Sequence, residues 1–117
     1  MSTLSIRIKQ ARLQAALSQE QLGILAGLDP SSASARMNRY ELGKRVPTPA
    51  FIERLALELG LTPAFFYSAD SDESELLTLY HRLDEAGRRA VMAAAREASD
   101  HRHATRRARS SHRPDQR

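Results

Sequence analysis

The chain has no cysteine, and none of its 117 residues belong to a long apolar run. Without cysteine it has no disulfides, thiolate zinc sites or cysteine nucleophiles. A membrane-spanning helix needs about 18 or more consecutive apolar residues, so none is expected here. Arg7, Lys9 and Arg12 interrupt the apolar segment that a signal peptide would require. These absences favour a cytoplasmic protein without contact to a membrane.

The formal net charge is only +4, but its distribution along the chain is uneven. Residues 1–67 carry eight Lys and Arg against five Asp and Glu, and residues 68–99 carry four against seven. Residues 100–117 hold six Arg against Asp100 and Asp115, which accounts for the whole surplus. The order is therefore basic, acidic and basic again. Such a charge pattern gives information about binding partners rather than about the fold.

Helix start and stop signals recur through residues 1–67. Ser18 followed by Gln21 three residues later is a capping box that begins a helix, and Gly27 is a natural terminator. Further signals are Asp29-Pro30 and Gly43 around a third helix, Thr48 and Gly60 around a fourth, and Thr62-Pro63 before a fifth. Together with an amphipathic first helix, they predict a five-helix all-α domain without a credible strand.

The remaining chain divides by composition into two further segments. Residues 68–99 begin with the polar acidic stretch "SADSDESE", a linker or cap, and continue with a helical extension that Asp84 and Gly87 divide in two. Residues 100–117 are rich in Ser, Arg and His and have no apolar periodicity. They are expected to form a disordered basic tail.

The order of elements resembles the Xre-type helix-turn-helix family, which includes the lambda-repressor and Cro class of regulators. The resemblance covers residues 4–66. It is carried by Gln19 near a capped helix start, by Gly27 in a sharp turn, and by "MNRYELGKRVPTP" and "LALELGLTPAFF". It implies a lambda-repressor-like domain and a sequence-specific transcriptional regulator, in particular a repressor. Such a regulator binds a near-palindromic site in double-stranded DNA as a homodimer.

The third helix, expected over residues 30–42, has two different faces. Ala33, Met37 and Glu41 share one side by i, i+4 spacing, and Asn38 and Arg39 lie on the other. In the major groove, Arg can fork onto guanine and Asn onto adenine, although such a face is also typical of any solvated helix. The resemblance implies base reading by Ser34, Ala35, Asn38 and Arg39, and phosphate contacts by Gln19, Lys44 and Arg45. Arg36, on a flank of the helix, is also expected to contact phosphate.

Four more residues separate Gly27 from Glu41 than the family pattern has. Because Asp29-Pro30 is a start signal and four residues are close to one helical turn, we expect a third helix lengthened at its N-terminus. The alternative is a longer irregular turn before a helix capped by Ser31, Ser32 or Ser34.

Two charged residues occupy apolar positions. Arg12 lies on the stripe of the first helix with Leu4 and Ile8, and Glu41 lies on the apolar side of the third helix. An unpaired charge at either position would be costly. The family pairs these two positions, so Arg12 and Glu41 are expected to form a buried, hydrogen-bonded ion pair.

Residues 74–99 carry more apolar surface than a short appendage can hide. We therefore expect them to contribute to the homodimer, through Leu76, Tyr80, Leu83 and Val91 with Leu77, Leu79 and Met92 nearby. The alternative is packing against Phe65 and Phe66 of the same chain.

Catalytic and metal-binding patterns are missing. No Ser/His/Asp set, phosphate loop or pair of cleft acids can be assembled, so neither enzymatic activity nor a cofactor is expected. His101, His103 and His112 lie in the tail without a rigid partner, and the carboxylates of residues 70–75 lack the spacing of a calcium loop. The short helical extension cannot enclose a ligand pocket of about 300 Å³, so no small-molecule effector is expected.

Two other functions fit parts of the sequence. The chain could be a protein-binding module, such as an antitoxin-like partner, with weak affinity for DNA and a protein bound on residues 74–99. Alternatively, the arginine tail alone could bind nucleic acid without sequence preference, in which case removal of residues 100–117 would abolish binding.

Overall fold

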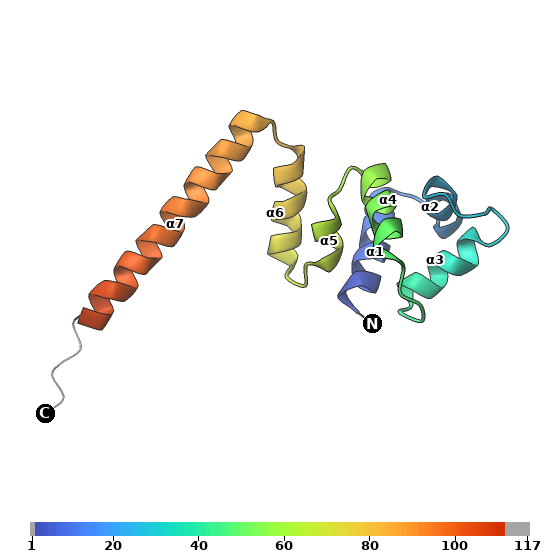
Figure 1. The fold of residues 1–117 in the computed structure, drawn as a ribbon, viewed down its shortest axis with the longest axis horizontal. Coiled ribbons are helices and arrows are strands. Elements are labelled where there is room, and N and C mark those ends of the chain that lie inside the picture. Colours follow the sequence, from blue (N-terminus) through green and yellow to red (C-terminus); the bar gives the residue numbers. More distant parts are fainter. Residues whose placement is uncertain (1, 112–117) are drawn as a thin grey trace, which may run out of the picture. The chain divides into compact units, whose positions relative to one another are not determined.

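The computed structural model describes residues 2–111, with side chains up to residue 109, and these residues form helices and no strands. The prediction of an all-α fold is therefore confirmed. The helices are α1 (Thr3–Gln14), α2 (Gln19–Leu25), α3 (Ala33–Glu41), α4 (Pro49–Leu59), α5 (Pro63–Tyr67), α6 (Ser71–Arg82) and α7 (Glu85–Ser111) (Figure 1). The chain separates into two compact units, one ending at His81 and one beginning at Arg82.

The N-terminus of α2 and both ends of α4 lie where the capping signals predict them. The amide of Gln21 donates to Oγ of Ser18 at 3.0 Å, and the amide of Ser18 donates to Oε1 of Gln21 at 2.8 Å. Thr48 accepts from the amide of Phe51 at 3.2 Å, and Gly60 ends α4 with a left-handed φ of 66°. These local contacts satisfy backbone groups that a helix end leaves without partners.

The core of the first unit takes apolar side chains from all of its first five helices. The buried side chains include Ile8 from α1, Leu22 from α2, Met37 from α3, Leu55 from α4 and Phe66 from α5. Each of them is completely covered, so each contributes about 1.5–3 kcal/mol of hydrophobic stabilisation. This shared core fixes how α2 and α3 are presented.

The chain after α5 is attached to α1 by a buried arginine. Nε of Arg7 donates to the carbonyl of Ser68 at 2.8 Å, and Nη2 donates to the carbonyl of Ala69 at 3.2 Å. Asp70 then caps α6, because its Oδ1 accepts from the amide of Glu73 at 2.9 Å. The acidic stretch is therefore a structured cap, and the first compact unit ends after His81 rather than after residue 67.

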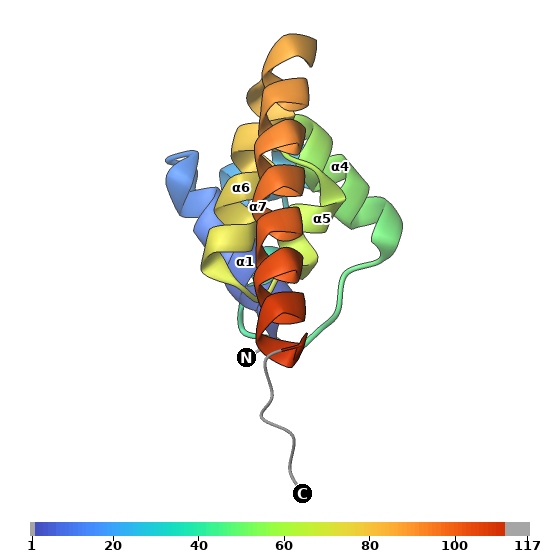
Figure 2. The same cartoon turned by 90° about the vertical axis from the view of Figure 1, so that its left-hand side faces the viewer.

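The second unit consists chiefly of α7, one continuous helix (Figure 2). Asp84 begins it by accepting from the amide of Gly87 at 2.7 Å, as expected from the division of the extension into two helices. The structure differs from the predicted disorder at residues 100–111, which are helical. Ala and Arg are strong helix formers, and this range contains neither Gly nor Pro. The rest of the predicted tail, residues 112–117, lies outside the described residues.

Candidate nucleic-acid interface

α2 and α3 pack closely because of Gly23 in the middle of α2. A Cβ atom at this position would lie 2.8 Å from Cβ of Ala33 and 3.1 Å from Cγ of Met37. Any larger residue would therefore push the two helices apart. Gly27, with a φ of 93°, turns the chain out of α2 toward α3. This pair of helices is the helix-turn-helix that the sequence predicts.

The prediction of a lengthened third helix is wrong, because α3 begins only at Ala33. The residues before it form a longer turn, in which Oδ1 of Asp29 accepts from the amide of Ser31 at 2.9 Å and from its hydroxyl at 2.7 Å. The Ser31 hydroxyl, and then its amide, hold the pKa of the Asp29 carboxyl below its ordinary value. Asp29 thus stabilises a local turn that competes with helix formation.

The exposed face of α3 contains all four residues that were assigned to base reading. Ala33, Met37, Tyr40 and Glu41 are buried on the opposite face. The exposed residues are Ser34, Ala35, Asn38 and Arg39. The core therefore positions the helix without using the side chains that could contact a ligand.

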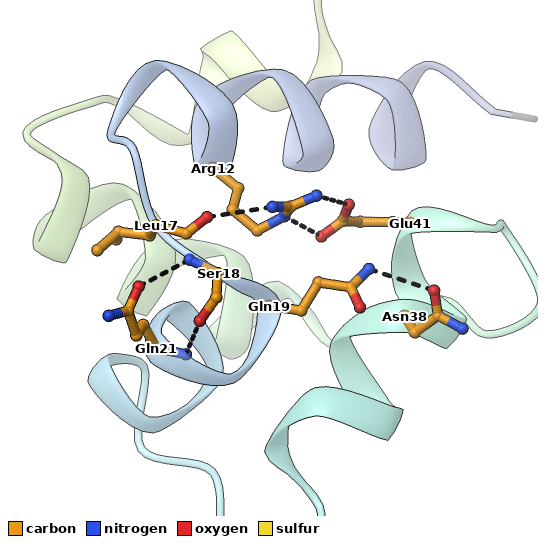
Figure 3. Close-up of polar contacts among 7 residues, drawn as sticks. All are labelled: Arg12, Leu17, Ser18, Gln19, Gln21, Asn38 and Glu41. Atoms are coloured by element: carbon orange, nitrogen blue, oxygen red, sulfur yellow. Dashed lines mark hydrogen bonds and ion pairs between the residues drawn. The ribbon is translucent and has the colours of Figure 1, made fainter.

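One exposed side chain of α3 is held from α2. Nε2 of Gln19 donates to Oδ1 of Asn38 at 3.2 Å (Figure 3). This contact was not predicted from the sequence, because nothing in the spacing of the two residues indicates that the helices cross there. The amide group of Asn38 is oriented by the bond, and its remaining donor and acceptor capacity faces outward.

Lys44 and Arg45 lie immediately beyond the C-terminus of α3. Gly43 adopts a φ of 72°, which turns the chain so that the amides of both residues donate to the carbonyl of Arg39, at 3.0 Å and 3.3 Å. Such a left-handed glycine commonly ends a helix. Both cationic side chains are exposed.

Arg36 is positioned differently from the other predicted phosphate contacts. It is half-buried, and its Nη2 donates to the hydroxyl of Tyr40 at 3.2 Å. Its Nε is buried and has no hydrogen-bond partner among the described residues. The Tyr40 ring in turn packs against Phe51, with ring centroids 5.3 Å apart. Arg36 therefore lies along α3 instead of extending freely into solvent.

The expected ion pair between Arg12 and Glu41 is present and bidentate (Figure 3). Nε and Nη2 of Arg12 donate to the two carboxylate oxygens at 2.8 Å and 3.0 Å. Nη1 also donates to the carbonyl of Leu17 at 3.1 Å. One guanidinium group thus connects α1, the segment before α2 and the end of α3, which fixes the direction of α3.

The four residues assigned to dimerisation belong to both compact units. In the first unit, Leu76 is half exposed at 51% and Tyr80 is partly buried. In the second unit, Leu83 is exposed at 37% and Val91 is partly buried. Leu79, on α6, is as exposed as Leu76. The apolar surface of α6 is thus only partly covered by the described part of the chain.

Metal-binding clusters and membrane-spanning helices do not occur within the described residues. No group of three or more His, Asp or Glu side chains there could hold a metal ion. None of the helices in the same part of the chain has both the length and the apolar composition needed to cross a bilayer.

Comparisons with known proteins point to the same two helices. A family model described as "Helix-turn-helix domain" matches residues 3–64, which include all of α2 and α3. The crystal structure of the transcriptional regulator BswR is similar, with 34% sequence identity and a TM-score of 0.74. The similarity covers 80% of this chain and 92% of that chain. A search of curated proteins found no match.

Proposed function

Because the chain belongs to the helix-turn-helix domain family, we propose that it is a sequence-specific DNA-binding transcriptional regulator of the Xre type. In this proposal it acts without catalysis, as a repressor that occupies its operator. The observation that carries the proposal is the division of α3 into a buried face and an exposed face of small, amide and basic residues. A helix of this kind fits the major groove, which is about 12 Å wide.

Base reading is assigned to the exposed face of α3. Arg39 can donate two hydrogen bonds to O6 and N7 of a guanine, and Asn38 can pair with N6 and N7 of an adenine. Ser34 and Ala35 have small side chains, which allow a close approach to the bases. The bond from Gln19 to Asn38 supports this assignment, since it limits the orientations that the amide can adopt.

Phosphate contacts are assigned to residues around this face. Gln19 is the first residue of α2, where free amides and the helix dipole favour an anion. Lys44 and Arg45 follow α3 and are exposed, so they can reach the wall of the groove. Arg36 can contribute once its guanidinium moves away from Tyr40. This movement breaks the bond from Nη2 to the Tyr40 hydroxyl, but it exposes Nε, which is buried without a partner among the described residues.

The proposal includes a homodimer on a near-palindromic operator. Two copies related by a two-fold axis would place their α3 helices in successive major grooves, about 34 Å apart. The exposed leucines of α6, together with Tyr80, Leu83 and Val91, are the surface proposed for this contact. Dimerisation would double the number of bases that are read.

Selection from a pool of random DNA duplexes tests the proposal. The full chain is expected to enrich a sequence with two related half-sites about ten base pairs apart, and to protect that sequence in footprinting. A reporter gene behind the selected site should be repressed when the protein is expressed. Recovery of unrelated sequences, with no enriched half-site, would contradict sequence-specific recognition.

A protein-binding function is the second candidate, and the half-exposed Leu76 and Leu79 of α6 favour it. In that case residues 74–99 would bind a partner protein and the affinity for DNA would be weak. Salt dependence separates the two functions, because contacts to several phosphates give a steep decrease of DNA affinity with salt. An apolar protein interface would respond much less.

A further inference from the structure

Residues 100–109 of α7 contain four arginines, and three of them lie on one side of the helix. Arg102, Arg106 and Arg109 follow each other at spacings of four and three residues, which places them on one face. We call these three residues the basic face. With His101 and Thr105 they line a shallow concavity of about 520 Å³ on the helix surface. All three arginines are exposed.

Within the described residues, no acid neutralises the charge of the basic face. Among the ion pairs of the described residues, none includes Arg102, Arg106 or Arg109. Asp100 is the only acid between residues 100 and 109, and it precedes Arg102 by two residues. At 3.6 residues per turn the two side chains therefore point about 200° apart around the helix. The basic face is available to an external anion.

We propose that the basic face binds DNA phosphates and gives the regulator a second contact that does not depend on sequence. This inference rests on the proposed function, because α2 and α3 must first bring the chain to DNA. Arg102 and Arg109 are separated by about 10 Å along the helix axis. One DNA strand carries a phosphate about every 3.4 Å along its axis, so the basic face spans about three phosphates.

DNA suits this face better than other anionic partners do. A helix that lies on a membrane needs large apolar residues on its other side. Between residues 100 and 109 the apolar residues are only Ala104 and Ala108, which supply little area for insertion. A DNA duplex held by the first unit of the same chain is present at high effective concentration. An acidic protein would have no such advantage.

Matched charge removal tests this assignment. In one variant Arg102, Arg106 and Arg109 are replaced by Gln, and in the control Arg82, Arg89 and Arg96 are replaced by Gln. Both lose three charges, and the control residues are exposed and lie outside the basic face. Gln forms helices about as well as Arg, which circular dichroism can verify. Binding to a selected duplex and to an unrelated duplex is then measured at several salt concentrations.

For the first variant we expect weaker binding to both duplexes and the same selected sequence. Each phosphate contact contributes about 0.9 to the slope of log K against log salt, so the slope should fall by about 2–3. The control should keep the wild-type slope.

The outcomes separate this inference from the proposed function. If the wild-type chain binds no DNA, both the proposed function and this inference are refuted. If the wild type selects a sequence but the first variant keeps its slope, only the basic face is refuted. Equal losses in both variants would also overturn the inference, since they would indicate a general charge effect. The inference would also be overturned if the substitutions left DNA binding unchanged and altered only the binding to phosphatidylserine vesicles or to a polyglutamate peptide.

Discussion

At the scale of single residues, the Arg12–Glu41 ion pair is expected to stabilise the fold and to maintain the direction of α3. Removing one partner leaves a buried charge, so Arg12→Met or Glu41→Leu should each lower the free energy of unfolding by about 3–5 kcal/mol. Replacing both should cost much less, because no uncompensated charge remains. Urea unfolding of the two single variants and the double variant measures this coupling.

The pair of Arg54 and Glu58 on α4 provides the control. It has the same charges and a similar distance of 3.0 Å, but the Arg54 side chain is 51% exposed. Exposed pairs are worth at most about 1 kcal/mol, so Arg54→Met should change stability little. Similar losses at both pairs would contradict the role assigned to burial.

Arg39 and Lys44 are expected to affect DNA binding in different ways. Arg39→Ala should cost about 1–3 kcal/mol per half-site and relax the preference at one base position. Lys44→Ala should weaken all sequences about equally and reduce the salt slope by about one unit for each phosphate that is no longer bound. Binding to a randomised operator pool at two salt concentrations distinguishes them. An unchanged selected sequence with Arg39→Ala would show that this residue does not read bases.

Only some of these interactions between residues could be predicted from the sequence. The pairing of Arg12 with Glu41 could be inferred, because each charge interrupts an apolar stripe and would be costly without a partner, and because the resemblance to the Xre-type family pairs these two positions. The bonds from Arg7 to the backbone of Ser68 and Ala69 could not be predicted, since every residue has a carbonyl group and the sequence does not indicate which one accepts a bond. The bond from Gln19 to Asn38 depends on how two helices cross, which no local pattern encodes.

At the scale of helices, the contact between α2 and α3 depends on Gly23. Gly23→Ala would bring a methyl group to 2.8 Å from Cβ of Ala33, so one helix must move. Overpacking of this kind costs about 1–3 kcal/mol. We expect a lower melting temperature and weaker DNA binding, because α3 would be displaced.

A second substitution checks that this cost comes from the helix contact. Ala33→Gly removes the methyl group that would clash with the methyl group introduced by Gly23→Ala. The double variant should therefore regain part of the DNA affinity that Gly23→Ala loses. In the wild-type background, Ala33→Gly should only destabilise. If the double variant binds DNA no better than Gly23→Ala alone, the displacement of α3 is not the cause.

Helix ends followed from the sequence wherever one capping residue had one role. Ser18, Thr48 and Gly60 act as their types predict. Asp29 has two possible roles, because the same carboxylate can cap a helix or close a turn with Ser31, and the second is realised. In residues 100–111 the lack of apolar periodicity did not prevent a helix, because this range continues α7 from its earlier turns and contains neither Gly nor Pro.

At the scale of the whole molecule, the exposed leucines of α6 bear on assembly. Leu76→Asp would place a charge in the proposed dimer surface, and burying it unpaired would be too costly. Sedimentation velocity should then show a monomer, with a matching loss of operator affinity. Leu57→Asp is the control, because Leu57 is 76% exposed and lies on α4. A wild-type mass for the Leu76 variant would contradict the assignment of this surface.

The first compact unit extends past residue 67, where the composition becomes acidic. It continues to His81. Arg7 binds the chain just after α5, and Asp70 caps the next helix. Composition detects changes of charge, whereas compactness depends on such individual bonds.

The two faces of α3 also have a consequence for how this protein can diversify. Met37 and Tyr40 are buried, whereas Ser34, Ala35 and Arg39 are exposed on the same nine-residue helix. Surface substitutions away from structural features usually change stability by no more than about 0.5 kcal/mol. Under the proposed base reading, duplicated genes could therefore acquire different target sites by exchanging three exposed side chains. The scaffold would remain common to all copies, and each step would leave a folded protein for selection to act on.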